Sequence, residues 1–379
     1  MKKIIAIALA LCLALSLVAC GGAEAPAESA AASAAESVAA SVPAGGTVGV
    51  CIYKFDDNFM TTYRDALQAI LEEKGYEVTV VDGNNDQAKQ TEQINTFITQ
   101  GVDALIVNPV MTSAAAQIIA AVQEADIPTV IINREPEAAD MAAYNKLVYV
   151  GCDAAQSGTF QGELILETEN KGDINGDGKV SYIMIQGDPE NIDAKLRTEF
   201  SVKALTDAGV EVEQLDLQRG DWDQAKGQEI CANDLSKFGE QVEVVFCNND
   251  AMALGALEAI KAANRTVGKD IYLVGVDALD AALDAVKAGT MTGTVLNDAQ
   301  GQAAKAVECM EALLSGTTYA EGEQSVYVDY VKVTGANVAE FMGEAEAEVP
   351  AESAAVAESE VVAESAAVAE SEVAESAAA

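Results

Sequence analysis

The sequence contains no histidine among its 379 residues. Without an imidazole the chain has no Ser-His-Asp or Cys-His catalytic pair, and it lacks the usual nitrogen ligand of zinc. Basic residues are scarce as well, with 22 Lys and Arg against 61 Asp and Glu, for a formal net charge of −39. Nucleic acid and anionic lipid headgroups repel so acidic a chain, which argues against both as partners.

Paired cysteine motifs are also absent. The chain has seven cysteines and no CxxC pair, and Cys12 and Cys20 both lie near the N-terminus. Five cysteines remain, an odd number, and Cys51 and Cys247 lie in apolar strand-like runs where cysteine acts as a small hydrophobe. We therefore expect no obligatory disulfide.

The first residues have the pattern of a sorting signal. Lys2 and Lys3 precede an apolar run, 4–17, that is short for a membrane-spanning helix. The run leads into Leu-Val-Ala-Cys, which predicts a lipoprotein signal peptide over 1–19 and a diacylglycerol on Cys20. Two acyl chains hold a protein on a bilayer, so we expect an extracytoplasmic, lipid-anchored protein. An ordinary signal peptide with a chance cysteine is the alternative.

Two further segments lack the composition of a folded core. Residues 20–46 are rich in Ala, Ser, Glu, Pro and Gly without an aromatic, which predicts a flexible tether. Residues 344–379 hold ten Glu and no Lys or Arg, which predicts a disordered acidic tail, with transient helix as the alternative. The remaining segment, 47–343, is long enough for two domains.

Short apolar runs alternate with amphipathic, helix-length stretches along this segment. Such alternation predicts an α/β fold with parallel sheets that helices cover on both faces. The predicted strands are 48–53, 76–82, 104–108, 129–133, 147–151, 180–186, 210–217, 242–248, 272–277 and 291–296.

Several predicted strands end in polar residues. Asn108, the run 248–250 and Asp277 lie at such ends, and Asn297 directly follows the last strand. Ligands of open α/β sheets bind outside the carboxyl ends of the strands. Each residue could instead cap the next helix, but their recurrence in both halves favours a shared cleft. The chain has no GxGxxG after the first strand and no GxxxxGK[ST] phosphate loop.

Carboxylates beside aromatic residues favour a neutral sugar as the ligand. Asp57 and Phe59 follow the first strand, where a carboxylate can accept hydroxyl protons and a ring can cover the apolar face of a pyranose. Asp193 and Arg197 share one helix face, either as a surface ion pair or as a clamp on hydroxyls. Trp222 is the only tryptophan and lies between two aspartates, which favours a ligand platform.

The segment 173–181 has the spacing of a calcium loop. Asp173, Asn175 and Asp177 supply oxygen atoms at positions 1, 3 and 5, glycine follows at 6, and Lys179 offers a backbone carbonyl at 7. Position 12 is Met184, which cannot ligate, so the bidentate carboxylate must come from elsewhere. A turn rich in Asp and Asn without metal is the alternative.

These segments together resemble the galactose/glucose-binding branch of the periplasmic binding protein type I family, the sugar-binding lipoproteins of ABC transporters. The similarity covers 47 to about 341, and its most specific pieces are YKFDDNFM (53–60), DINGDGKVS (173–181), VEVVFCNNDAMALGA (242–256), VGVDAL (274–279) and GTVLNDAQ (293–300). The resemblance implies two Rossmann-like domains joined by a three-segment hinge: an N-terminal lobe of 47–134 and 297–325, and a C-terminal lobe of 135–296 and 326–343 with the calcium loop.

The resemblance also implies roles for individual residues. Hydroxyl contacts would come from Asp57, Asn108, Asp193, Arg197, Asn249, Asp277 and Asn297, and stacking from Phe59 and Trp222. Ca²⁺ would be held by Asp173, Asn175, Asp177, Lys179 and Ser181, completed by the distant Glu243. Where the family commonly has a sugar-binding histidine, this chain has Asn191, which leaves the preference between glucose and galactose open.

By this resemblance the chain is a monomeric binding protein without enzyme activity. It would bind glucose or galactose and deliver the sugar to an ABC transporter permease by hinge closure. One alternative is a partner that presents its ligand to a membrane chemoreceptor or sensor. Another is a glycoside hydrolase that uses paired carboxylates such as Asp57 and Asp277.

Overall fold

The computed structural model describes residues 45–342. The predicted signal peptide, Cys20, nearly all of the predicted tether and the acidic tail lie outside the described residues and stay predictions. Between residues 45 and 342, no helix is long and apolar enough to cross a bilayer.

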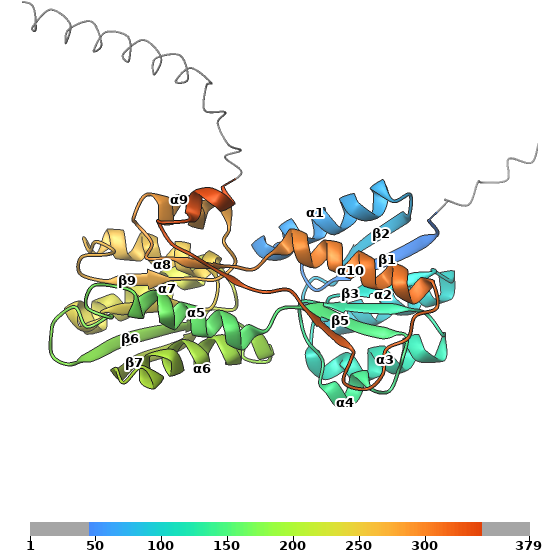
Figure 1. The fold of residues 1–379 in the computed structure, drawn as a ribbon, viewed down its shortest axis with the longest axis horizontal. Coiled ribbons are helices and arrows are strands. Elements are labelled where there is room, and N and C mark those ends of the chain that lie inside the picture. Colours follow the sequence, from blue (N-terminus) through green and yellow to red (C-terminus); the bar gives the residue numbers. More distant parts are fainter. Residues whose placement is uncertain (1–44, 343–379) are drawn as a thin grey trace, which may run out of the picture. The chain divides into compact units, whose positions relative to one another are not determined.

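The described residues form two lobes, each built on a sheet with helices on both faces (Figure 1). The first lobe has six parallel strands in the order β11-β5-β4-β3-β1-β2. Its strands are β1 (Thr47–Ile52), β2 (Glu77–Asp82), β3 (Ala104–Val107), β4 (Thr129–Ile132), β5 (Leu147–Gly151) and β11 (Ser325–Tyr327). β3, β4 and β5 are buried along their whole length because helices cover both faces.

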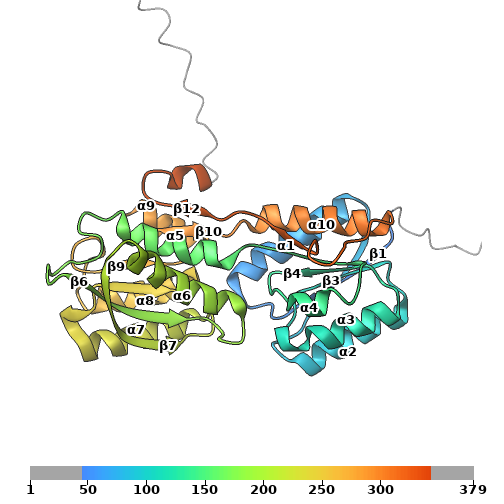
Figure 2. The ribbon, with the colours of Figure 1, turned by 60° about the horizontal axis from the view of Figure 1, so that its bottom comes forward.

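The helices of the first lobe lie in two layers (Figures 1 and 2). They are α1 (Asn58–Glu73), α2 (Gln87–Gln100), α3 (Ala115–Glu124), α4 (Ala138–Met141) and α10 (Ala299–Leu314). α1 and α10 pack on one face of the sheet, where α1 buries Met60, Tyr63 and Leu67 at helical spacing. α2 and α3 pack on the other face through residues such as Phe97 and Ile118.

The second lobe has four parallel strands in the order β7-β6-β8-β9. These are β6 (Lys179–Gln186), β7 (Glu211–Arg219), β8 (Val244–Cys247) and β9 (Tyr272–Val274). β10 (Thr294–Leu296) follows at the edge, joined by isolated bridges such as Asp277 to Leu296, and pairs antiparallel with β12 (Val331–Val333).

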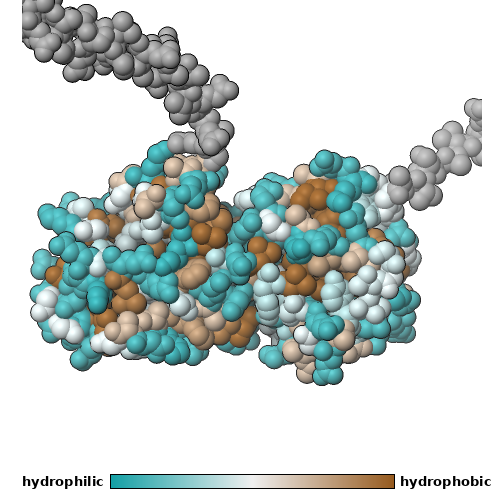
Figure 3. All heavy atoms as spheres, viewed as in Figure 1, coloured by the Kyte–Doolittle hydropathy of each residue, from teal (hydrophilic) through white to brown (hydrophobic). Residues whose placement is uncertain are grey.

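Helices again cover both faces of the second sheet. They are α5 (Ala154–Leu166), α6 (Ile192–Asp207), α7 (Gln224–Phe238), α8 (Asp250–Ala262) and α9 (Asp280–Lys287). α5 and α6 share one core with the sheet, and α7, α8 and α9 share another. Apolar residues on the face shown in Figure 3 form scattered patches among polar ones, without a continuous band.

The ten predicted strands are all present, and the parallel α/β architecture is confirmed. Two short strands, β11 and β12, were not predicted because three partly exposed residues leave no clear pattern. β9 ends at Val274 instead of residue 277, and the chain then turns so that Asp277 takes a φ of 125°.

The predicted lobe boundaries at 134 and 325 are corrected by the strand pairing. β5 pairs with β4, and β11 pairs with β5, so both belong to the sheet of the first lobe. The chain therefore crosses between the lobes after Gly151, at Asn297 and after Tyr327 (Figure 1). β5 is buried along its whole length, as expected for an apolar strand in the interior of a sheet. A boundary at 134 would have assigned this strand to the other lobe.

Candidate functional site

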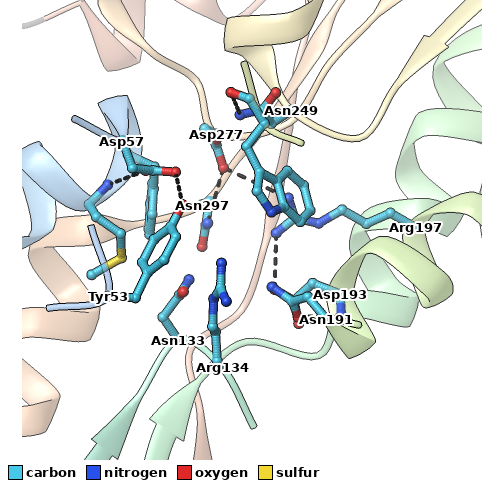
Figure 4. A pocket seen from close by; sticks show the side chains of 13 residues that line it. Tyr53, Asp57, Asn133, Arg134, Asn191, Asp193, Arg197, Asn249, Asp277 and Asn297 are labelled. Atoms are coloured by element: carbon cyan, nitrogen blue, oxygen red, sulfur yellow. Dashed lines mark hydrogen bonds and ion pairs between the residues drawn. The ribbon is translucent and has the colours of Figure 1, made fainter. Parts of the chain in front are cut away.

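One cavity lies between the two lobes, at the carboxyl ends of their strands (Figure 4). It encloses about 350 Å³ of space free of protein atoms, part of it open to solvent. The residues that line it are Tyr53, Asp57, Phe59, Met60, Asn133, Arg134, Asn191, Asp193, Arg197, Trp222, Asn249, Asp277 and Asn297. Nine of the ten predicted ligand-binding residues are in this set, and Asn108 is the exception.

Three of the lining residues also cap helices. Asp57 Oδ1 accepts the Met60 N–H at 2.8 Å at the start of α1, while its Oδ2 accepts the Tyr53 hydroxyl at 2.6 Å. Asn191 caps α6 and Asn249 caps α8 through their side-chain oxygens. Capping and lining are therefore not alternatives here, because the cap fixes the side chain at the cavity wall.

A buried charged pair on α6 forms the wall from the second lobe. Arg197 Nη2 lies 3.4 Å from Asp193 Oδ2, and both side chains are nearly inaccessible, so this is not a surface ion pair. Burial raises the pKa of Asp193 to about 6, although Arg197 lowers it. Arg197 Nη1 also donates to the Asn248 carbonyl at 2.9 Å and lies 4.0 Å from Asp277 Oδ1.

Asp277 and Asn297 meet where β10 leaves the second lobe. Asn297 Nδ2 donates to Asp277 Oδ1 at 3.2 Å. Burial raises the pKa of Asp277 well above its usual value, and Arg197 opposes that shift. The φ of 125° at Asp277 is a strained conformation for a residue with a side chain, and such strain gathers at ligand sites.

Trp222 is held against the cavity by a close backbone approach. Asp221 and Trp222 have φ values of 53° and 65°, a left-handed turn that places the indole over Gly187. A Cβ at Gly187 would lie 2.3 Å from the indole ring, so glycine is required there. Tyr53 and Phe59 line the cavity from the first lobe, so both lobes present aromatic rings to it.

Gly187→Ala is therefore expected to push the indole out of place and to weaken ligand binding about tenfold, since a lost aromatic contact amounts to roughly 1 kcal/mol or more. Trp222 is the only tryptophan, so its fluorescence reports the displacement directly. Gly335→Ala is the matched control, because a Cβ there meets nothing within 4 Å. An unchanged emission spectrum and affinity in Gly187→Ala would contradict this placement.

Asn108 does not line the cavity but lies buried beneath it. Its Oδ1 accepts the Tyr53 N–H at 3.3 Å, and its Nδ2 donates to Ile132 O and to Asn133 Oδ1, both at 3.2 Å. The prediction of Asn108 as a ligand contact is corrected accordingly: it ties the ends of neighbouring strands together. Asn133, which lines the cavity, was missed although it ended a predicted strand in the same way.

Arg134 was also missed. Its side chain is 3% exposed, its Cζ lies 3.8 Å from the Tyr53 ring centroid, and it donates to the Val110 carbonyl. Neither its Nε nor that of Arg197 has a hydrogen-bond partner among residues 45–342. Two buried N–H donors, one on each lobe, are thus left for a ligand with oxygen acceptors.

Glu243 lies against the predicted calcium loop. Its backbone N–H donates to the Ser181 carbonyl at 2.9 Å, which aligns the start of β8 with β6. Its Oε1 accepts the N–H groups of Ile174 and Asn175 at 2.8 and 2.9 Å, and its Oε2 accepts the Ser181 N–H at 2.8 Å. The strand pairing therefore brings this carboxylate to the loop across more than 60 residues.

The loop oxygens are engaged by the loop's own backbone. Asp173, Asn175 and Asp177 each accept N–H groups between residues 176 and 179. In this arrangement, residues 45–342 bring no three acidic, histidine or cysteine side chains together as a metal site. Glu243 is only 1% exposed, and neither it nor the loop aspartates form an ion pair within the described part of the chain, since Lys179 pairs with Glu213.

Comparisons with known proteins agree with this architecture. The family model for the periplasmic binding protein domain matches residues 48–318. The D-galactose/methyl-galactoside binding periplasmic protein MglB of Haemophilus influenzae is 36% identical over 312 residues, which cover 79% of this chain and 92% of that protein. A putative rhizopine-binding protein of Rhizobium meliloti is 35% identical over 300 residues, with 79% and 93% coverage.

A solved structure matches the same share of this chain. The ABC transporter solute binding protein of Bacillus halodurans, crystallised with myo-inositol, has a TM-score of 0.69 and 31% identity over 79% of this chain and 97% of its own. With the two-lobed parallel sheets and the cavity between them, these matches show that the chain belongs to the periplasmic binding protein family.

Proposed function

We propose that this protein binds a hexose, glucose or galactose, in the cavity between its lobes and delivers it to an ABC importer. The observation that carries the proposal is the lining itself: carboxylates, amides and two guanidinium groups converge from both lobes, with an aromatic ring on each. Such groups bond vicinal hydroxyls in pairs, and the rings cover apolar C–H faces. The galactose-binding name of the Haemophilus relative supports a hexose.

Closure of the two lobes on the sugar would complete the site. Asp57, Phe59 and Arg134 belong to the first lobe, and Asp193 and Arg197 to the second, so a ligand contacts all of them only when the lobes are together. Those differential contacts would shift the population toward the closed form that a permease recognises.

Titration calorimetry of the purified protein with Ca²⁺ tests the proposal, using glucose, galactose, ribose, xylose and myo-inositol. We expect a micromolar dissociation constant for one of the two hexoses, about 8 kcal/mol of binding free energy. Tight binding of myo-inositol or ribose alone would contradict the hexose assignment, and no binding to any of the five would overturn the proposed function.

We expect the affinity for the sugar to decrease as the pH is lowered, because two buried carboxyl groups take up protons. Burial raises the pKa of Asp193 to about 6 and also raises that of Asp277 well above its usual value. A sugar hydroxyl that donates to a carboxylate favours the ionised form, so protonation competes with binding. We expect binding to be about tenfold weaker at pH 5 than at pH 7.5 by calorimetry. Asp193→Asn should flatten the dependence of affinity on pH. An unaltered dependence in that variant would contradict the proposal that protonation of Asp193 competes with sugar binding.

We propose further that the loop at 173–181 binds Ca²⁺ with Glu243. A nearly inaccessible carboxylate against a loop with Asp173 and Asp177, none of the three in an ion pair among residues 45–342, is an arrangement that a divalent cation would stabilise. The residues that would hold the ion are the side chains of Asp173, Asn175, Asp177, Ser181 and Glu243 and the carbonyl of Lys179. The ion would link the loop to Glu243, which directly precedes β8, and would thereby stabilise the second lobe.

Anchoring through Cys20 and presentation of the ligand to a chemoreceptor are parts of the proposal that need their own tests, namely mass analysis of the acylated N-terminus and pull-down from membranes.

Hydrolysis is the less favoured function. Both carboxylate oxygens of Asp57 are already engaged, because Oδ1 accepts the Met60 N–H and Oδ2 accepts the Tyr53 hydroxyl. An assay for glucoside hydrolysis is expected to give none.

A further inference from the structure

Tyr330 lies on the third chain crossing, between β11 and β12, and is not one of the cavity-lining residues. Its side chain is 4% exposed. Its hydroxyl accepts a hydrogen bond from Arg197 Nη2 at 2.9 Å, and its backbone N–H donates to Gln156 Oε1 at 2.8 Å on α5. The third crossing is thus fastened to the second lobe next to a residue of the proposed ligand site.

The donors of Arg197 show what this contact does. Nη1 donates to the Asn248 carbonyl at 2.9 Å, and Nη2 donates to Tyr330 and, at 3.4 Å, to Asp193. Tyr330 therefore makes the shorter of the two bonds to Nη2. Because the guanidinium is planar, fixing both Nη atoms also fixes the direction of Nε–H, the donor that has no protein partner.

A second set of contacts joins the first two crossings beside Arg197. Cys152 follows β5 on the first crossing. Burial raises the pKa of Cys152, so the thiol keeps its proton and donates to Asn297 Oδ1 at 3.4 Å on the second crossing. Asn297 then donates to Asp277, whose Oδ1 lies 4.0 Å from Arg197 Nη1.

We infer that Tyr330 is a positioning residue for ligand binding, which holds the Arg197 guanidinium in its binding geometry from the third crossing. The inference rests on the proposed function, since it assigns Tyr330 to the same site. Tyr330 acts through Arg197 and does not touch the ligand. Tyr330→Phe would leave Nη2 with the long bond to Asp193 alone, so that only the Nη1 bond to the Asn248 carbonyl would still hold the guanidinium firmly.

Tyr330→Phe tests the inference by calorimetry with the hexose that the parent protein binds best. We expect binding about tenfold weaker, since a hydrogen bond to a charged group is lost. Tyr182→Phe is the matched control: Tyr182 is also a buried second-lobe tyrosine, its hydroxyl bonds Gln214 at 3.1 Å, and it does not line the cavity. The control should bind within twofold of the parent and show a similar change in melting temperature.

A double-mutant cycle with Arg197→Lys separates positioning from general destabilisation. If Tyr330 acts through the guanidinium fork, Tyr330→Phe should weaken binding less than threefold once Arg197 is lysine. Equal losses in both backgrounds, or binding by Tyr330→Phe within twofold of the parent, would overturn the inference while leaving the proposed function intact. A parent protein that binds no sugar would overturn both.

Discussion

Arg197→Met is expected to weaken hexose binding more than a hundredfold and to destabilise the ligand-free protein by about 3–5 kcal/mol. The guanidinium lies among Asp193, Asp277, the Asn248 carbonyl and Tyr330, all of them buried. Removing it leaves two buried carboxyls without their cation, and the penalty of an unpaired buried charge exceeds the net contribution of the pair. Titration calorimetry gives the affinity, and scanning calorimetry without sugar gives the stability.

The matched control for this variant lies on the same helix. Lys203 and Asp207 form an i,i+4 ion pair on α6 at 2.6 Å, but both side chains are about half exposed. Lys203→Met should therefore change stability by less than about 1 kcal/mol and leave affinity unchanged. Arg197→Lys keeps the charge without the planar fork, and it provides a folded variant if Arg197→Met does not fold. Affinity within threefold of the parent in Arg197→Met would contradict the proposed site.

Removing calcium is expected to lower the melting temperature by roughly 5–10 °C. A ligand present at a thousand times its dissociation constant stabilises the folded state by about 4 kcal/mol, and each kcal/mol shifts a domain of this size by a few degrees. The affected carboxylate is Glu243, which is buried against the backbone of the loop at Ile174 and Asn175. Scanning calorimetry with Ca²⁺, and again with excess chelator, measures the difference.

The response to calcium, not the absolute melting temperature, decides the role of Glu243. Glu243→Gln is expected to melt lower than the parent in chelator as well, because its amide would meet backbone N–H groups, but it should gain little from added Ca²⁺. Glu211→Gln, an exposed change on the neighbouring β7, should keep the full response of the parent. If chelator leaves the parent's melting temperature unchanged, the loop binds no calcium.

Much of the fold could be predicted because its signals are local. Apolar runs alternating with amphipathic stretches predicted ten of the twelve strands between residues 45 and 342, since a strand buried on both faces needs an unbroken apolar sequence. Polar residues at strand ends predicted a cleft for a similar reason, because parallel strands present their carboxyl ends on one edge. Nine residues predicted for ligand binding line one cavity on this basis.

The sequence by itself determined the architecture and the chemical character of the cavity, since periodicity and residue type are properties of short segments. Tertiary structure alone decided which of two similar asparagines faces the cavity, because Asn108 is turned under it by bonds to Tyr53 and Ile132 while Asn133 is not. It also decided that β5 belongs to the first lobe and that Tyr330 bonds Arg197 across 133 residues. Contacts between distant segments depend on how the elements pack, and no local pattern contains that information.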